Sequence, residues 1–456
     1  MVIFMLLKKS KIKLYKFYYF LLIFFFRLTF NLKSDFLSSL IILISIKRIK
    51  KVSQNSKNSK NILIFSKVGG IDDVITAYQK KKNNKINFFI IHRIFFRIIY
   101  NRYFSKTNLR DYSYKINTKK LEDLSKKYSR KIDYYLSFIN KFYNFKSIIS
   151  FNPFYKAERI IQKNSKKHNI KFIVLHKESV NSKYDNKVLE YLYSNKIEKF
   201  EGEAIATYSN LEKKLLINSG FIDKKKIVTV GSPRCDLSYQ YRKISPDKDV
   251  ITYYMLETQR GVPGYFLGGL SKVEKRILCE RLKLNVNDLK INWNDLNKKT
   301  IGYCIDYAKK NKDIKIIFKG KQSTHTRSDL PSNLPENCTF IKDGSGHELL
   351  KKSKIIIGFN STIILEAMLA NRSILVPYFN FKEINKKKDF IIDFNNKNYW
   401  VKTRSDFFQK IDKLIKNKYK YKKLSKPEKK ILVQFIGNSD GKACKRLIKF
   451  INSSIR

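Results

Sequence analysis

Short apolar runs alternate with polar helical stretches along most of the chain. Each run has the length of a buried strand, and the stretches between them have the spacing of helices. The expected strands lie at 61–65, 86–91, 146–151, 171–175, 204–208, 227–230, 250–256, 314–318, 339–342, 354–358 and 373–377. This alternation predicts an α/β protein whose parallel sheets are covered by helices.

The strands fall into two series, which predicts two Rossmann-like domains. A chain of 456 residues is also too long for a single hydrophobic core to be the default. The expected division is listed here in chain order: a hydrophobic and basic segment at 1–58, a first domain at 59–238, a linker at 239–249, a second domain at 250–432 and a last segment at 433–456. Two such domains face a cleft, and their ligands bind at the carboxyl ends of the strands.

The amino-terminal segment contains two apolar runs, Phe17–Phe26 and Phe36–Ile46, with basic residues on both sides. Each run is shorter than the roughly 20 residues that cross a bilayer, so a crossing would require Lys16 or Arg27 near one end. Flanking cations favour a helical hairpin that lies in the interface of an anionic membrane. A buried hairpin of a soluble protein is the alternative. No small-residue cleavage site follows the first run, so we expect no secretory signal.

The composition is strongly basic, with 95 Lys and Arg against 38 Asp and Glu and a formal net charge of +57. Such a charge is typical of proteins that bind nucleic acid or anionic membranes. The lysines are spread along the whole chain, however, and base-stacking and groove-reading motifs are absent, so we do not expect nucleic acid binding. Over-used Lys, Asn, Ile, Phe and Tyr share A/T-rich codons, which accounts for much of the charge.

Neither a metal site nor an organic cofactor is expected. The five cysteines are far apart and form no CxxC pair, which indicates reduced core residues of a cytosolic protein. Asp247-Lys-Asp249 imitates a metal-binding DxD sequence but lies in the polar linker. We therefore interpret it as solvated charge.

The most informative stretch runs from Gly358 to Glu366. An apolar strand ends at Gly358, Asn360 and Ser361 form a tight turn, and Thr362 is expected to begin a helix whose free N–H groups bind phosphate. Glu366 lies one turn into that helix and would accept hydrogen bonds from ribose hydroxyls. The alternative is an ordinary helix cap followed by a solvated glutamate.

Three segments resemble known families. Asn360–Pro377 (NSTIILEAMLANRSILVP) resembles the nucleotide-binding segment of GT-B transferases. Ile205–Asp236, which ends in GSPRCD, is similar to the end of the first domain in the CDP-glycerol glycerophosphotransferase family and related capsule proteins. Phe435–Phe450 looks like their closing helix, which crosses back to the first domain. Together the resemblance covers about the last half of the chain.

The resemblance implies a metal-independent GT-B glycosyltransferase. Its donor would be a nucleotide-activated sugar, and its acceptor a glycan or lipid-linked glycan in bacterial surface polysaccharide synthesis, of the capsule or lipopolysaccharide type. The location implied is the cytoplasmic face of the plasma membrane. A CDP-alditol-dependent glycerophosphotransferase and a non-catalytic GT-B-like assembly protein remain alternatives, because a fold alone does not establish activity.

Besides Asn360, Ser361, Thr362 and Glu366, the candidate donor ligands are Lys319, Lys321, Arg234 and His347. The two lysines stand after a strand where the resembled families carry a His-Pro pair, and they would still neutralise a diphosphate. Arg234 either contacts a phosphate or, as we expect, pairs with Asp236. His347 would contact the base or a phosphate from the first turn of a helix.

A sugar transferase by single displacement also needs a base. The candidates are Glu178 and His176, just after a strand, and Asp72 after the Gly69-Gly70 turn. A carboxylate at the carboxyl end of a strand faces the cleft, which favours Glu178. A glutamate that only pairs with Lys177 is the alternative.

Overall fold

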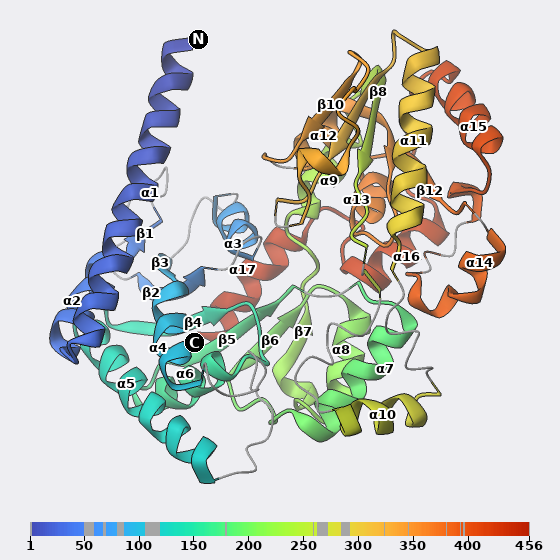
Figure 1. Cartoon of the computed structure of the whole chain (residues 1–456). Helices are drawn as coiled ribbons and strands as arrows, with labels where there is room; N and C mark the ends of the chain where they lie inside the picture. The colour runs from blue at the N-terminus through green and yellow to red at the C-terminus, as the bar shows by residue number, and fades with distance from the viewer. Residues whose placement is uncertain are drawn as a thin grey trace.

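The computed structural model describes residues 2–49, 59–66, 70–79, 86–104, 119–177, 180–258, 260–261, 272–283, 292–322, 324–344, 346–379, 381–392, 394 and 397–455. It contains two sheets with helices on their faces, one formed by the first half of the chain and one by the second (Figure 1). The predicted α/β class with two parallel sheets is confirmed. Among the described residues, no helix combines the length and apolar character needed to cross a membrane.

The first sheet has seven strands in the order β1-β3-β2-β4-β5-β6-β7. All neighbours are parallel except the short edge strand β1, which pairs antiparallel with β3. The strands are β1 (Lys47–Arg48), β2 (Lys60–Ser66), β3 (Ile86–His92), β4 (Phe145–Ser150), β5 (Lys171–His176), β6 (Ala204–Thr207) and β7 (Ile227–Thr229). β5 is buried from Phe172 to His176, and in β4 only Lys146 is exposed, because helices cover both faces of the sheet.

Helices of the first half cover this sheet. They are α3 (Gly70–Gln79), α4 (Ile94–Phe104), α5 (Lys119–Tyr143), α6 (Lys156–Lys167), α7 (Lys183–Tyr191) and α8 (Asn210–Asn218). Before them, α1 (Val2–Asn31) and α2 (Asp35–Ser45) form a hairpin at the edge of the molecule, far from the second sheet (Figure 1). The hairpin packs on α4 and α5, where Phe26 is fully buried against Phe95 and Tyr135.

The second sheet has six parallel strands in the order β10-β9-β8-β11-β12-β13. The strands are β8 (Asp247–Tyr254), β9 (Lys315–Lys319), β10 (Cys338–Ile341), β11 (Ser353–Ile357), β12 (Ser373–Pro377) and β13 (Trp400–Val401). The strand order reverses between β8 and its neighbours β9 and β11. In open α/β sheets such a reversal opens a crevice at the carboxyl ends of the strands.

The helices of the second half are α10 (Lys272–Arg281), α11 (Asn294–Lys310), α12 (Gly346–Lys352), α13 (Ile363–Leu369), α14 (Phe381–Lys386), α15 (Arg404–Lys416), α16 (Lys426–Ile436) and α17 (Ala443–Ser454). Arg372 is buried after α13, and its guanidinium donates to Leu350 O, Ala370 O and Tyr241 O. These bonds satisfy helix-end carbonyls that would otherwise lack partners.

The expected linker at 239–249 is mostly regular structure. Residues 239–241 complete α9 (Cys235–Tyr241), and Asp247–Asp249 begin β8. The polar side chains of this stretch concealed both ends, because the first residues of β8 are exposed and therefore carry no apolar pattern. Only 242–246 connect the two elements.

Two of the passages of the chain between the halves, one before α9 and one after α16, meet at two glycines. Gly231 and Gly437 both have positive φ, and a Cβ at Gly231 would lie 2.4 Å from Gly437 O. Ser232 N donates to Ile436 O at 2.9 Å across this contact. Beyond it, α17 packs with α3 on the first sheet, in a core that includes Ile62, Ile64 and Leu447.

Candidate functional site

A cavity of about 560 Å³ lies where the carboxyl ends of both sheets meet. The second sheet contributes residues after β8, β9, β10 and β11, and the first sheet contributes residues after β5, β6 and β7. All eight predicted donor ligands line it: Arg234, Lys319, Lys321, His347, Asn360, Ser361, Thr362 and Glu366. Residues more than a hundred positions apart therefore share one site, at the place where this kind of fold binds ligands.

The turn after β11 differs in detail from the prediction. The helix begins at Ile363, and the Thr362 side chain makes no capping bond. Asn360 adopts the left-handed conformation, with φ of 46°. Its side-chain amide donates to Arg260 O and Phe390 O, and its carbonyl oxygen accepts from Ile392 N. The Asn360 side chain therefore holds the loop at Phe390–Ile392. The ligand role that we predicted for it would require these hydrogen bonds to break.

Glu366 and His347 form a pair on the wall of the cavity. The Glu366 carboxylate lies 3.2 Å from His347 Nδ1, and only 7% of Glu366 is exposed. Burial raises the pKa of Tyr254 well above its usual range, and the nearby Glu366 adds to the rise. Tyr254 therefore stays a neutral hydroxyl, which donates to Gly346 O at the start of α12 and helps to place His347.

Lys319 ends β9, and Lys321 lies in the loop after it, which His325 holds. His325 is buried, its Nδ1 accepts from Lys321 N at 3.1 Å, and its Nε2 donates to Leu256 O at 3.1 Å. Lys319 Nζ donates to Lys342 O at 2.7 Å. Burial lowers the pKa of Lys319, and Asp343 partly opposes the change. Lys321 pairs with Glu257 on the rim.

Arg234 is fixed by a carboxylate from the first half. Its backbone N–H and guanidinium both donate to Asp73, at 2.9 Å and 2.8 Å, and Tyr208 donates to the same carboxylate. Burial alone would lower the pKa of Arg234, but Asp73 outweighs it and the pKa is raised. The predicted Arg234–Asp236 pair is wrong, because Asp236 instead accepts backbone N–H bonds at the start of α17.

Three further cations, which were not predicted, lie on the cavity wall: Lys177, Arg260 and Lys342. Lys177 and Lys342 each follow directly after a strand, so the strand-end rule that selected Lys319 would have found them. Across the described lining, six Lys and Arg side chains face two carboxylates, Glu257 and Glu366. This excess of positive charge in a concave site suits a phosphorylated ligand.

Of the predicted catalytic residues, the two that the structure describes, His176 and Asp72, do not line the cavity. His176 is 1% exposed and its Nε2 lies 3.0 Å from Glu212 Oε1, so the side chain belongs to the core of the first half. Asp72 is exposed on α3 and is not part of the described cavity lining. Glu178 lies outside the described residues. The described side chains also contain no group of three or more His, Cys, Asp or Glu arranged to hold a metal ion.

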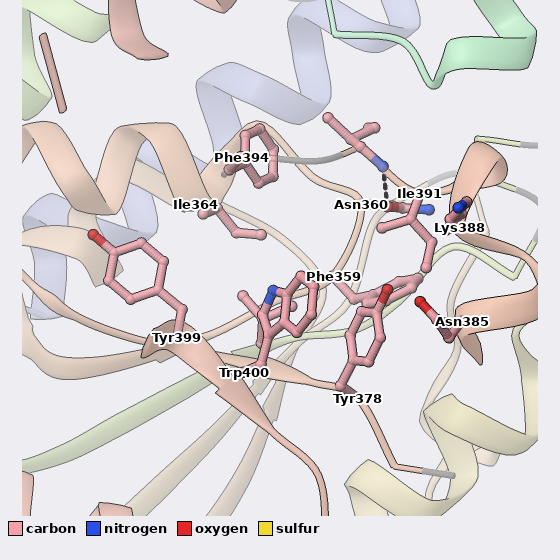
Figure 2. A pocket seen from close by; sticks show the side chains of 12 residues that line it. Phe359, Asn360, Ile364, Tyr378, Asn385, Lys388, Ile391, Phe394, Tyr399 and Trp400 are labelled. Atoms are coloured by element: carbon pink, nitrogen blue, oxygen red, sulfur yellow. Dashed lines mark hydrogen bonds between the residues drawn. The ribbon is translucent and has the colours of Figure 1, made fainter. Parts of the chain in front are cut away.

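A second cavity of about 170 Å³ adjoins the first behind Phe359 and Asn360 (Figure 2). Tyr378 and Trp400 stack on its floor, with ring centroids 4.3 Å apart. Ile364, Ile391 and Phe394 complete a mostly apolar wall. This cavity suits an apolar group, unlike the larger and more polar site beside it.

Comparisons with known proteins give matches in structure alone. No family model and no curated protein sequence matches the chain. UDP-GlcNAc 2-epimerase from Neisseria meningitidis, bound to UDP-GlcNAc, is similar over 86% of this chain and 100% of its own, with TM-score 0.42 and 14% identity. The wall teichoic acid polymerase TagF is similar over 96% and 97%, with TM-score 0.45 and 11% identity. TarM covers 72% and 58%, with TM-score 0.34 and 16% identity.

These identities and TM-scores describe a distant similarity. Function therefore has to be inferred from the side chains of the site.

Proposed function

We propose that the chain is a GT-B-type glycosyltransferase that moves a sugar from a nucleotide-activated donor to a glycan or a lipid-linked acceptor. The observation that carries this proposal is the cationic cavity between the two sheets, whose lining includes Glu366, His347 and Arg234. A nucleoside diphosphate has a phosphate part that needs cations and a ribose whose hydroxyls need an acceptor. Both kinds of group line this one site.

The diphosphate would lie against Arg234, Lys319 and Lys321. Arg234 is already oriented by Asp73, so little side-chain freedom is lost when it binds an anion. Ser361 and Thr362 add hydroxyl donors beside these cations. Glu366, buried on the wall of the cavity, would accept from ribose hydroxyls.

Leaving-group stabilisation is the catalytic contribution that these residues offer. As the bond from the sugar to the diphosphate breaks, negative charge grows on the diphosphate, and fixed cations stabilise that charge without reorganising. No metal is needed for this role. Neither His176 nor Asp72 reaches the cavity, so we do not assign the acceptor's base to either of them.

One observation favours a second candidate, the transfer of an alditol phosphate from a CDP-linked donor. There the bond that breaks is at phosphorus, and cations must surround the reacting phosphoryl group itself. Arg234, Lys319 and Lys321 come from both halves of the chain and line the same cavity. The two candidates differ in the nucleotide that the cavity should prefer.

The biological setting is part of the proposal. We place the enzyme in bacterial surface polysaccharide assembly, of the capsule or lipopolysaccharide type, at the cytoplasmic face of the plasma membrane. The resemblance of Ile205–Asp236 to capsule and glycerophosphotransferase proteins supports this setting.

The test is a thermal-shift screen of the purified protein against UDP, GDP, CDP and CMP. A ligand that binds the folded state at about 100 times its Kd adds about 2.7 kcal/mol of stability, which raises Tm by several degrees. Glu366→Ala should abolish the shift, whereas Glu348→Ala, an exposed carboxylate on α12, should retain it.

The outcomes separate the candidates. A shift with UDP or GDP supports sugar transfer, and a shift with CDP or CMP supports alditol phosphate transfer. If no nucleotide shifts Tm, the transferase proposal fails in favour of a non-catalytic assembly protein that kept the fold.

A further inference from the structure

The outer face of α1 is apolar although its inner face already packs on the protein. Leu22, Phe26 and Phe30 are buried in the core of the first half. On the opposite side, a stripe is between 46% and 69% exposed: Phe17, Phe20, Phe24 and Leu28 of α1, and Leu32 directly after it. A helix that is hydrophobic all round is normally surrounded by apolar material on every side.

In α2, the second helix of the hairpin, serine side chains are buried and large apolar side chains are exposed. Ser38, Ser39 and Ser45 of α2 are fully buried, whereas Phe36 and Ile44 are 56% and 59% exposed. The serine hydroxyls are satisfied internally. Ser45 Oγ donates to Ile42 O at 2.6 Å, and Ser38 Oγ shares a hydrogen bond with Thr29 of α1. Small polar residues between helices and large apolar residues outside are typical of helices in contact with lipid.

The apolar face continues onto the end of α5. The ring of Phe36 packs against Phe138, with centroids 5.9 Å apart, and Phe138 packs against Phe142 at 5.4 Å. Phe142 is 62% exposed. The helices α1, α2 and α5 therefore each carry exposed apolar residues, and we call these residues together the hairpin face. Exposed apolar residues that are scattered singly need no explanation, but a group of this kind marks an interaction surface.

Charge around the hairpin face is positive. The single acidic residue between positions 17 and 46 is Asp35, and Lys131 of α5 pairs with it at 2.6 Å. Arg27 and Lys33 of the hairpin and Arg48 shortly after it are exposed. Aromatic residues beside cations match the region of a bilayer where acyl chains meet anionic headgroups.

We infer that the hairpin face binds the surface of an anionic lipid bilayer, with α1 and α2 lying along the interface. The inference deepens the proposed membrane location and rests on the proposed function only in that respect, because it uses no residue of the nucleotide cavity. An orientation along the surface follows from the hairpin itself: its inner side stays attached to α4 and α5, so only its outer side is open to lipid.

The experiment measures co-sedimentation of the full chain with vesicles of phosphatidylglycerol and phosphatidylcholine, against vesicles of phosphatidylcholine alone. Phe24→Ser/Leu28→Ser/Leu32→Ser removes apolar groups from the exposed stripe without touching the core. It should weaken binding to the anionic vesicles by at least about tenfold. Val273→Ser/Ile277→Ser on α10 removes similarly exposed apolar groups elsewhere and should bind like the wild type.

Further measurements identify what binds the hairpin face. The tryptophan fluorescence that a Phe24→Trp variant gains over the wild type should be quenched by brominated phospholipid in the vesicles. Such quenching reports burial of that position among acyl chains. Equal binding by the triple variant and the wild type would overturn the inference. So would a dimer, seen on gel filtration and lost in the triple variant, with no vesicle binding, since the occupant would then be a second copy. The triple variant should keep the nucleotide shift of the wild type, so failure of either proposal is seen separately.

Discussion

Asp73 shows how one buried carboxylate can organise a site without lining it. It is fully buried on α3, yet it binds the backbone and the guanidinium of Arg234 and the hydroxyl of Tyr208. Burial raises the pKa of Tyr208 well above its usual range, and Asp73 contributes to the rise. Arg234 thereby reaches the cavity in a single orientation, set by a residue about 160 positions earlier in the chain.

We expect Asp73→Asn to destabilise the fold by about 2 kcal/mol, because it leaves a partly buried guanidinium without its counter-charge. Urea unfolding measures this loss. Asp72→Asn changes the neighbouring, exposed carboxylate and should stay within about 0.5 kcal/mol of the wild type. Equal stability of both variants would mean that Asp73 does not hold Arg234 in solution.

Lys319 gives the site a pH dependence with a definite sign. Burial lowers its pKa in the free protein, and a bound phosphate would raise it again by favouring the charged form. Nucleotide affinity should therefore be full well below the lowered pKa and fall as pH rises through it. The fall should begin below the usual lysine pKa of about 10.4.

Titration calorimetry between about pH 7 and pH 10, with the nucleotide that shifts Tm, measures this profile. Lys319→Arg keeps its charge throughout and should flatten it. Lys315→Arg, at the exposed start of the same strand, should reproduce the wild-type profile. A wild-type affinity that does not change with pH would remove Lys319 from the site.

The residues of the site were predictable to different degrees, and β5 shows why. Successive strand residues point to opposite sides. The sequence placed His176 and Lys177 together at a strand end, but it did not tell which of them faces the cavity. The structure buries His176 against Glu212 and brings Lys177 to the cavity wall. The partner of Arg234 was equally hidden, because nothing local in the sequence links it to Asp73.

At the scale of elements, the parallel strands were predictable because strands that are buried on both faces consist mainly of apolar residues. The predicted 373–377 coincides with β12, and the others match to within a few residues. The short edge strands β1 and β13 were missed, since two residues carry no pattern. The hairpin was predicted from its apolar runs. That the serines of α2 are buried and its large apolar residues exposed depends on which side of α2 packs on α5, and the sequence does not show this.

The closing helix α17 offers a test of how the two halves are tied together. Asp236 of α9 is 1% exposed and accepts from Ala443 N, Cys444 N and Asn438 Nδ2 at 2.8–3.0 Å. We expect Asp236→Ala to cost about 2–3 kcal/mol in urea unfolding, because three buried donors lose their acceptor. It should also speed amide exchange at the start of α17.

Asp440→Ala is the matched control, since Asp440 pairs with Arg446 near the surface. It should cost less than about 1 kcal/mol. If the two variants lose the same stability, Asp236 does not cap α17, and the closing helix is held by its apolar contacts with the first sheet alone.

For the whole molecule, the dominant property is the net charge of +57. Charge of this size attracts any polyanion, so a filter-binding assay with duplex DNA at low salt should give a signal. Because the cations are spread over the chain and match no groove, that affinity should fall by about 10³-fold or more between roughly 50 mM and 200 mM salt. It should also be indifferent to DNA sequence.

The same assay separates diffuse charge from the cavity. Ser361→Ala/Glu366→Ala removes two groups of the cavity, so it should abolish the nucleotide-induced rise in Tm. It leaves the net charge almost unchanged, so the weak DNA affinity should stay as it was. A DNA affinity that survives about 200 mM salt and disappears in this variant would have the opposite meaning. The cavity would then bind polynucleotides, and its cations would serve a nucleic acid backbone in place of a sugar donor.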